Sequence, residues 1–241
     1  TYGLAQIHAP TAWERYGTRG AGATIAVLDS GVDATHPDID LARWAEFNES
    51  GGRVGSEPRD IDPRGHGTHV SGTATGGAAS GTHIGVAPAA DLYHGAVLTD
   101  CSGPSCSGSV AQILAGMEWA VAHDADVLSM SLGARGLRPR FVEPIRNAEA
   151  AGTVVVASSG NSGPLSSNSP GNVYDSIAVG AATDSRQIAP FSGGEEITTS
   201  EWGSFAPDDW PAEYVVPTVS APGAGVTSAE PDDAYGTKDG T

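Results

Sequence analysis

The chain has 241 residues, of which 39% are hydrophobic, so it is long enough for one domain with a sizeable core. Its formal net charge is −17, from 29 acidic and 12 basic residues, and Lys238 is its only lysine. This acidity argues against a nucleic acid or an anionic membrane as partner, because both would repel the chain. The acidic residues are spread along the whole sequence, which favours a surface suited to high salt, and we therefore expect a halophilic source.

The chain alternates short apolar runs with segments of helical periodicity. We expect helices at residues 9–16, 110–123 and 141–151. We expect strands at residues 24–28, 90–98, 127–133, 153–158, 176–180 and 215–222. Because strands that alternate with helices imply crossover units, we predict one α/β domain with a mostly parallel β-sheet flanked by helices. An acidic segment at residues 192–217, with Trp202 and Trp210, is expected to be an exposed excursion.

Polar side chains follow several of the predicted strands. Asp29 closes the first strand, Ser131 lies near the end of the third, and Asn161 follows the fourth. In open parallel sheets, functional sites gather at the carboxyl ends of the strands. His66 precedes a run of small residues that is typical of a tightly packed helix, so its ring is placed to face a cleft. We expect these four segments to converge on one site.

Each of these residues has an ordinary structural interpretation as well as a chemical one. Asp29 alone would cap the turn that follows it, and Asn161 alone would be a turn residue in the left-handed region. Together with His66, whose imidazole titrates near neutrality, Asp29 would instead hold one ring N–H, and the amide of Asn161 would donate to an oxyanion. The segment ending at Gly133 is either a core strand or a strand edge that pairs with an extended peptide.

The His-x-x-His pattern of His66 and His69 suggests a metal site, but it lacks the glutamate that a zinc-peptidase helix needs. Gly67 occupies the place beside the first histidine where zinc peptidases carry that residue. We therefore interpret His69 as a packed structural residue. The remaining histidines have no partner pattern and are interpreted as surface or structural residues: His8, His36, His83, His94 and His123.

The two cysteines, Cys101 and Cys106, are separated by a segment with a Gly-Pro turn that brings them within bonding reach. We expect a disulfide, the alternatives being half of a metal site or free thiols. A disulfide would favour an extracellular location. The sequence contains neither a secretory signal nor a transmembrane run, as expected either for a secreted protein without its signal or for a cytosolic one.

Five segments of the chain resemble the signature segments of the subtilisin-like serine peptidases (subtilases), in the order and at the approximate spacing of that family. They are residues 27–33 (VLDSGVD), 65–73 (GHGTHVSGT), 130–133 (MSLG), 159–161 (SGN) and 220–223 (SAPG), and residues 2–10 also resemble the mature amino terminus of a member. The resemblance implies an extracellular, monomeric serine endopeptidase that acts on peptides or proteins and needs no cofactor for its chemistry.

The resemblance also implies a role for individual residues. Asp29 and His66 match the aspartate and histidine of the catalytic triad, and Asn161 matches the asparagine of the oxyanion hole. Pro170 matches a proline that family members often hold in a cis peptide. The substrate-binding positions that match are Ser131, Leu132 and Gly133 on one wall of the first specificity pocket, Ser158, Ser159 and Gly160 on the other, and Cys106, Ser107 and Gly108 in an edge strand that pairs with substrate. The small pocket residues imply a roomy, apolar first pocket.

The match to the nucleophile segment stops at Gly240 and Thr241, and the family serine would be the next residue. We therefore expect residues 1–241 to be a peptidase domain that lacks the nucleophile segment and the helix that follows it. The chain is then a fragment of a longer enzyme, an enzyme whose last piece is separate or removed, or a non-catalytic relative that only binds peptides.

Structural calcium occurs in the family, and Asp38 matches one ligand of a common site. The partner loop at residues 77–82 lacks the usual asparagine, and the usual amino-terminal glutamine is absent. We assign no metal-binding residue on this basis.

Overall fold

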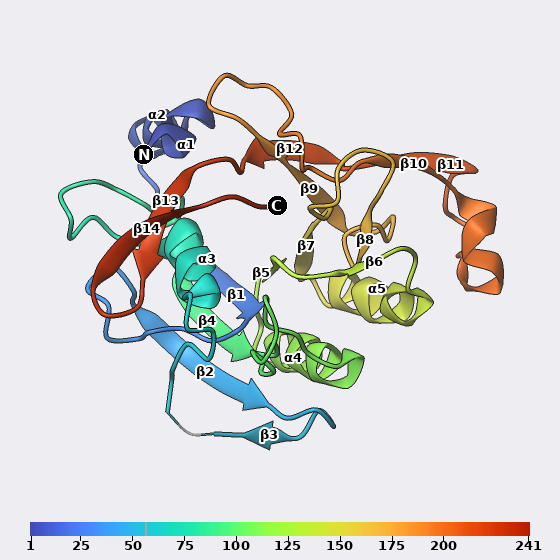
Figure 1. Cartoon of the computed structure of the whole chain (residues 1–241), viewed down its shortest axis with the longest axis horizontal. Helices are drawn as coiled ribbons and strands as arrows, with labels where there is room; N and C mark the ends of the chain where they lie inside the picture. Colours follow the sequence, from blue (N-terminus) through green and yellow to red (C-terminus); the bar gives the residue numbers. More distant parts are fainter. Residues whose placement is uncertain (56) are drawn as a thin grey trace. The chain divides into compact units, whose positions relative to one another are not determined.

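The computed structural model describes residues 1–55 and 57–241. Its chain forms two compact units, which are described separately. The first unit comprises Thr1–Ser129 and Val226–Thr237, and the second comprises Met130–Gly225 and Lys238–Thr241. Each unit contains parallel strands with at least one helix packed on them, which agrees with the predicted α/β class (Figure 1).

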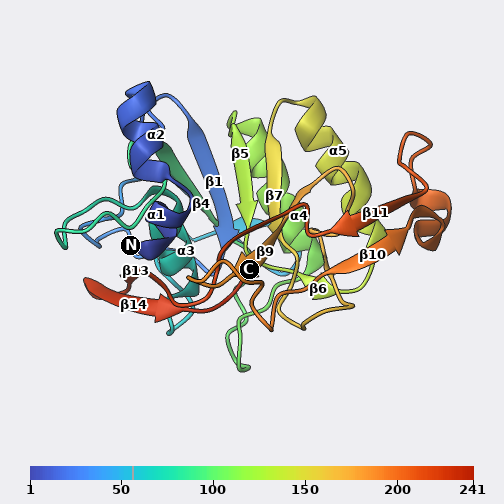
Figure 2. The same ribbon diagram turned by 90° about the horizontal axis from the view of Figure 1, so that it is seen from above.

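Strand β1 (Thr24–Asp29) is an inner strand of the sheet in the first unit. It pairs in parallel with β4 (Asp91–Ala96) on one side and with β5 (Val127–Met130) on the other, as Figure 2 shows. The sheet continues from β4 to β2 (Leu41–Phe47), which is parallel, and then to β3 (Arg53–Val54), which is antiparallel. Residues 26–29 of β1 are fully buried because both faces of the sheet are covered.

Helices α3 (His66–Thr75) and α4 (Val110–Ala122) cover opposite faces of β1. Val27 packs in a cluster with residues of α3, whereas the next residue, Leu28, lies against Gly116 of α4. Successive side chains of a strand point to opposite faces, so the two helices must lie on different sides of the sheet. A capping box fixes the start of α4, with Ser109 and Gln112 each bonding the other's backbone N–H.

The first unit also contains a hairpin and two amino-terminal helices. A hairpin of β13 (Val226–Glu230) and β14 (Ala234–Lys238) packs against α3, on the other side from β1 (Figure 1). Near the amino terminus, α1 (Tyr2–Gln6) is followed by α2 (Ala9–Tyr16). The predicted helix at 9–16 is confirmed, and it ends at Gly17, whose φ of +64° is left-handed.

The second unit has its own parallel strands, in the order β12 (Val219–Pro222), β9 (Ile177–Ala182) and β7 (Val154–Ser158). Helix α5 (Val142–Ala150) packs on β7 and follows a single 3₁₀ turn, η1 (Pro139–Phe141). The remaining elements are β6 (Ala134–Arg135), β8 (Asn168–Ser169), β10 (Glu195–Thr198), η2 (Thr199–Phe205) and β11 (Glu213–Val216).

Two predictions for this unit were wrong. The strand expected at 215–222 is two strands, because Pro217 has no N–H to continue a ladder; β11 pairs antiparallel with β10, and β12 joins β9. The segment at 192–217 is not simply an exposed excursion, because Trp202 and Trp210 are only 2% and 7% exposed. Their rings meet edge to face at 5.5 Å, and Trp202 Nε1 donates to the hydroxyl of Tyr214.

Candidate active site

Asp29 and His66 meet where β1 ends and α3 begins. The side chain of Asp29 is fully buried, and its Oδ1 accepts the N–H of Ser30 at 2.7 Å and the Nδ1–H of His66 at 2.7 Å. The carboxylate accepts this bond, so the hydrogen lies on Nδ1 of the imidazole. The side chain of His66 is 41% exposed, so it is accessible to solvent although Asp29 holds its Nδ1.

Two glycines allow this contact because the turn after β1 and the first turn of α3 touch backbone to backbone. A Cβ on Gly67 would lie 2.0 Å from the carbonyl oxygen of Gly31, and a Cβ on Gly31 would lie 2.0 Å from that of Arg59. Gly31 also has a φ of +118°, which other residues rarely adopt. The glycines of the two sequence motifs are thus required for the approach of Asp29 and His66.

The pair shifts the titration of both of its members. Burial raises the pKa of Asp29, but the charge and hydrogen bond of His66, helped by His94 and the N–H of Ser30, outweigh it and lower the pKa overall. The charge of Asp29 raises the pKa of His66 to about 9 against the opposing effect of burial, and the Asp29 hydrogen bond and the charges of Asp62 and Asp60 act in the same direction. The site therefore stabilises an imidazolium.

His94 of β4 is a second histidine at this site, and the sequence did not assign it a role there. It is fully buried, its Nε2 accepts the N–H of Gly31 at 3.1 Å, and its Nδ1 lies 2.9 Å from Oγ of Ser71. Since Nε2 is the acceptor, Nδ1 carries the hydrogen and donates to Ser71. Burial lowers the pKa of His94 to about 4 against the effect of Asp29, so the ring is neutral at pH 7. The available signal was a polar residue in an apolar strand next to β1.

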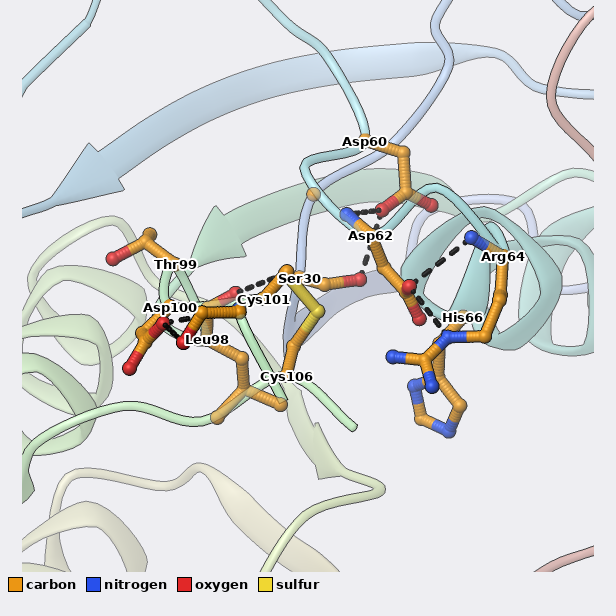
Figure 3. The surroundings of a disulfide bond; sticks show 12 residues. Ser30, Asp60, Asp62, Arg64, His66, Leu98, Thr99, Asp100, Cys101 and Cys106 are labelled. Atoms are coloured by element: carbon orange, nitrogen blue, oxygen red, sulfur yellow. Dashed lines mark hydrogen bonds and ion pairs between the residues drawn. A yellow bond between two sulfur atoms is a disulfide. The ribbon is translucent and has the colours of Figure 1, made fainter. Parts of the chain in front are cut away.

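The cysteines lie in a short loop of the first unit. Cys101 and Cys106 form a disulfide, and outside it the backbones of Asp100 and Ser107 exchange two hydrogen bonds of 3.1 and 2.8 Å. A Cβ on Gly108 would lie 1.9 Å from the carbonyl oxygen of Val97, so this end of the loop packs closely on the chain that leaves β4. Figure 3 shows His66 and Ser30 among the surroundings of the disulfide.

Asn161 lies in the second unit, where it contacts Thr241. Oδ1 of Asn161 accepts the backbone N–H of Thr241 at 3.1 Å and the hydroxyl of Thr241 at 3.0 Å. The N–H of Gly160 donates to the same hydroxyl at 3.2 Å. These bonds fix the side-chain amide with Oδ1 as its accepting end. Nδ2 is then the end that can donate to a ligand.

The two predicted walls of the substrate pocket are joined within the second unit. The hydroxyl of Ser158 donates to the carbonyl oxygen of Leu132 at 3.1 Å, and that of Ser131 donates to Thr241 at 2.7 Å. A Cβ on Gly133 would lie 2.9 Å from the side chain of Asn168, which shows how closely the segment after β5 approaches β8. Ser159 is buried with its hydroxyl on the carbonyl of Gly193, so its side chain supports the loop.

Asp38 and His69 both have protein partners. His69 is 5% exposed and its Nε2–H donates to the carbonyl of Val226, as expected for a packed structural residue. The two oxygens of Asp38 accept the N–H of Ala79 at 2.6 Å and the hydroxyl of Tyr235 at 2.7 Å. Among residues 1–55 and 57–241, no cluster of three or more His, Cys, Asp or Glu side chains is arranged to hold a metal ion. The same residues contain no helix that is both long and apolar enough to span a bilayer.

A carboxylate at the end of a buried parallel strand, bonded to a histidine at the start of a helix, defines an α/β protein with an acid–base site. Residues 20–241 match the model of the subtilase family. Subtilisin Savinase of Lederbergia lenta is 35% identical over 240 residues, which cover the whole of this chain and 78% of the relative. The chain belongs to the subtilase family.

Other relatives are longer than the chain. An alkaline protease of Shouchella clausii is 35% identical over 240 residues, and subtilisin E of Bacillus subtilis is 36% identical over 246 residues. Both alignments include the whole chain, which spans 55% of the first relative and 56% of the second, or about half the length of each. In this structure Pro170 follows a cis peptide bond, as the family resemblance implied.

Proposed function

We propose that the chain is the larger part of a serine endopeptidase, with residues 1–241 forming most of its peptidase domain. The observation that carries this proposal is the 2.7 Å bond from Nδ1 of a half-exposed His66 to the buried carboxylate of Asp29. Membership of the subtilase family supports it, as do the relatives that are named subtilisins and proteases.

In this mechanism the nucleophile is a serine that lies outside the 241 residues. It attacks the carbonyl carbon of a peptide bond while His66 takes its proton, and His66 then gives that proton to the leaving amine. Asp29 keeps His66 in the tautomer with hydrogen on Nδ1 and stabilises the imidazolium. In a triad, replacing this aspartate with asparagine leaves the histidine in the wrong tautomer and lowers kcat by about 10⁴-fold.

Asn161 completes the proposed chemistry by donating its Nδ2–H to the oxyanion of the tetrahedral intermediate. Its Oδ1 is already bonded to Thr241, which supports this orientation of the amide. Removing one such donor costs about 3 kcal/mol of transition-state stabilisation. No cofactor takes part in these steps.

The substrate is a peptide or protein, bound in extended form along main-chain groups. Ser131, Leu132 and Gly133 line one wall of the first pocket, and Ser158, Ser159 and Gly160 line the other. The pocket is roomy and apolar. The edge strand that pairs with the substrate backbone is formed by Cys106, Ser107 and Gly108.

We further propose that the protein is a secreted monomer from a halophile, with neither nucleic acid nor membrane as partner. The Cys101–Cys106 disulfide supports an oxidising compartment, and the net charge of −17 supports a high-salt environment. Raising the KCl concentration should raise the thermal unfolding midpoint. A midpoint that is highest in dilute buffer would remove the halophilic part of the proposal.

The test of the activity uses the full-length protein that contains Gly240, Thr241 and the residues after them. A serine-directed phosphonylating reagent should add one group to the protein, and peptide hydrolysis should stop in proportion. His66→Ala should abolish both reactions and leave the fold intact. If the protein binds peptides yet neither cleaves them nor reacts with the reagent, it is a peptide-binding relative without catalytic activity.

A further inference from the structure

Helix α3 begins without a side-chain cap of its own. Its N-cap residue is Gly65, which has a φ of +66° and has no side chain to accept a hydrogen bond. The first backbone N–H groups of a helix have no partner inside it and need acceptors from elsewhere. Because His66 is the first residue of this helix, whatever supplies these acceptors also holds the backbone that carries the imidazole.

Two residues outside the helix supply them. The N–H of Gly67 donates to Oγ of Ser30 at 3.0 Å, and the N–H of Thr68 donates to Oδ2 of Asp60 at 2.8 Å. Ser30 in turn donates its hydroxyl to Oδ1 of Asp60 at 2.8 Å, so both acceptors depend on one carboxylate. Figure 3 shows the bonds that join the carboxylate of Asp60 to the side chain of Ser30 and to the backbone of Asp62.

Asp60 uses its full capacity as an acceptor in this network. Its Oδ1 accepts from Ser30 and from the N–H of Asp62 at 3.1 Å, and its Oδ2 accepts the N–H and, at 2.7 Å, the hydroxyl of Thr68. An ionised carboxylate has about four lone-pair sites, so all are occupied. Since Ser30 directly follows Asp29, the network joins the two segments whose side chains form the Asp29–His66 bond.

We propose that Asp60 is a positioning residue of the active site, a carboxylate that caps α3 from outside the helix and locks His66 in register with Asp29. This inference rests on the proposed function, in which His66 is the general base. Asp60 touches neither the imidazole nor the substrate in this scheme. It acts through Ser30, Gly67 and Thr68.

The charge of Asp60 has a separate effect, which the experiment must distinguish from capping. Burial raises the pKa of Asp60 because lost hydration outweighs its bonds from Thr68 and Ser30. Its negative charge contributes to the raised pKa of His66, as do those of Asp29 and Asp62. Asp62 lacks the capping contacts, since its Oδ1 accepts from the backbone and side chain of Arg64. Asp62 is therefore a matched control for charge alone.

The experiment compares Asp60→Ala, Asp60→Asn and Asp62→Asn in the full-length protein. The measurements are the pKa of the His66 imidazole by NMR, amide hydrogen exchange at Gly67 and Thr68, and kcat and KM for a peptide substrate. Exchange at Gln112, whose N–H is capped by Ser109 in α4, reports any general loosening of the fold.

All three variants should lower the pKa of His66, because each removes one nearby negative charge. Only the Asp60 variants should speed exchange at Gly67 and Thr68, by about tenfold for Asp60→Ala and less for Asp60→Asn, which keeps an acceptor oxygen. Asp60→Ala should lower kcat by about tenfold or more while KM stays within about twofold. Exchange at Gln112 should not change.

Two results would overturn the inference. One is an Asp60→Ala protein that unfolds cooperatively as the parent does and keeps the parent's exchange at Gly67 and Thr68. The other is an Asp62→Asn protein that speeds this exchange as much as Asp60→Ala. If the parent protein cleaves no peptide, the proposed function fails, but the exchange and pKa measurements still decide the role of Asp60.

Discussion

Acid should destabilise this protein through His94, in a pH range where most carboxylates remain ionised. The ring is fully buried and neutral, and the pKa of His94 is lowered from 6.5 to about 4 by burial. As pH falls from 6.5 to about 4, His94 binds a proton in the unfolded chain but stays neutral in the folded chain. The fold therefore loses stability between pH 6.5 and 4, and this loss levels off below pH 4.

The shift from 6.5 to about 4 corresponds to about 3 kcal/mol, at 1.36 kcal/mol for each pKa unit. The ionisable group that faces His94 is Asp29, and the neutral groups are Ser71 and the stacked ring of Trp44. Below pH 4, Asp29 adds its own loss, because the pKa of its carboxyl is lowered. The raised pKa of His66 lowers stability only as pH rises above 6.5, and this loss is common to the parent and a His94 variant.

The assay is urea unfolding at several pH values from 4 to 7.5, for the parent and for His94→Gln. Glutamine lacks a titrating group but can still accept from Gly31 and donate to Ser71. As pH is lowered from 7.5 to 4, the free energy of unfolding should fall by about 3 kcal/mol more in the parent than in the variant. Equal pH dependence in the two proteins would show that His94 is not held neutral, and the argument from its burial would fail.

Three further predictions follow from contacts of the first unit. The value of kcat/KM for the full-length enzyme should rise with pH as His66 loses its proton near its pKa of about 9. Added salt should lower the midpoint of this rise, because the side chain of His66 is 41% exposed. A midpoint near pH 6.5 would contradict the raised pKa. Tyr235→Phe should lower the free energy of unfolding by about 1–3 kcal/mol in a thermal melt, because an oxygen of Asp38 loses its hydroxyl donor. A chelator should not change the unfolding midpoint of the parent. The reverse pattern would indicate a cation at Asp38. Reduction of the Cys101–Cys106 disulfide, which closes a short loop, should lower the free energy of unfolding by about 2 kcal/mol and should raise KM more than it lowers kcat. Unchanged peptide binding would argue against an edge strand at Ser107.

The parts of the molecule that follow from local pattern were predictable from the sequence. The apolar run that forms β1 and the helical spacing of α4 each specify an element without help from distant residues. The pairing of Asp29 with His66 was also predictable, because Asp29 ends a buried strand, His66 opens a helix of small residues, and both match triad positions of the subtilases.

The parts that depend on distant partners were not predictable. Nothing local indicates that His94 accepts from Gly31, or that Asp60 caps a helix beginning six residues later, since both roles arise only after β1, β4 and α3 have packed. Trp202 and Trp210 were misjudged because their acidic neighbours suggested a solvated segment. Their burial comes from contacts with each other and with Tyr214, which follows them in the chain.

The hairpin of β13 and β14 determines when helix α3 can complete its packing during synthesis of the chain. A Cβ on Gly72 would lie 2.5 Å from Oγ of Ser228, and a Cβ on Gly65 would lie 2.1 Å from the ring of Pro231, so α3 fits closely against this hairpin. During synthesis, the ribosome must translate roughly 150 more residues after α3 before these partners emerge. The segment that carries His66 therefore completes its packing late, which delays the maturation of any peptidase activity until most of the chain has left the ribosome.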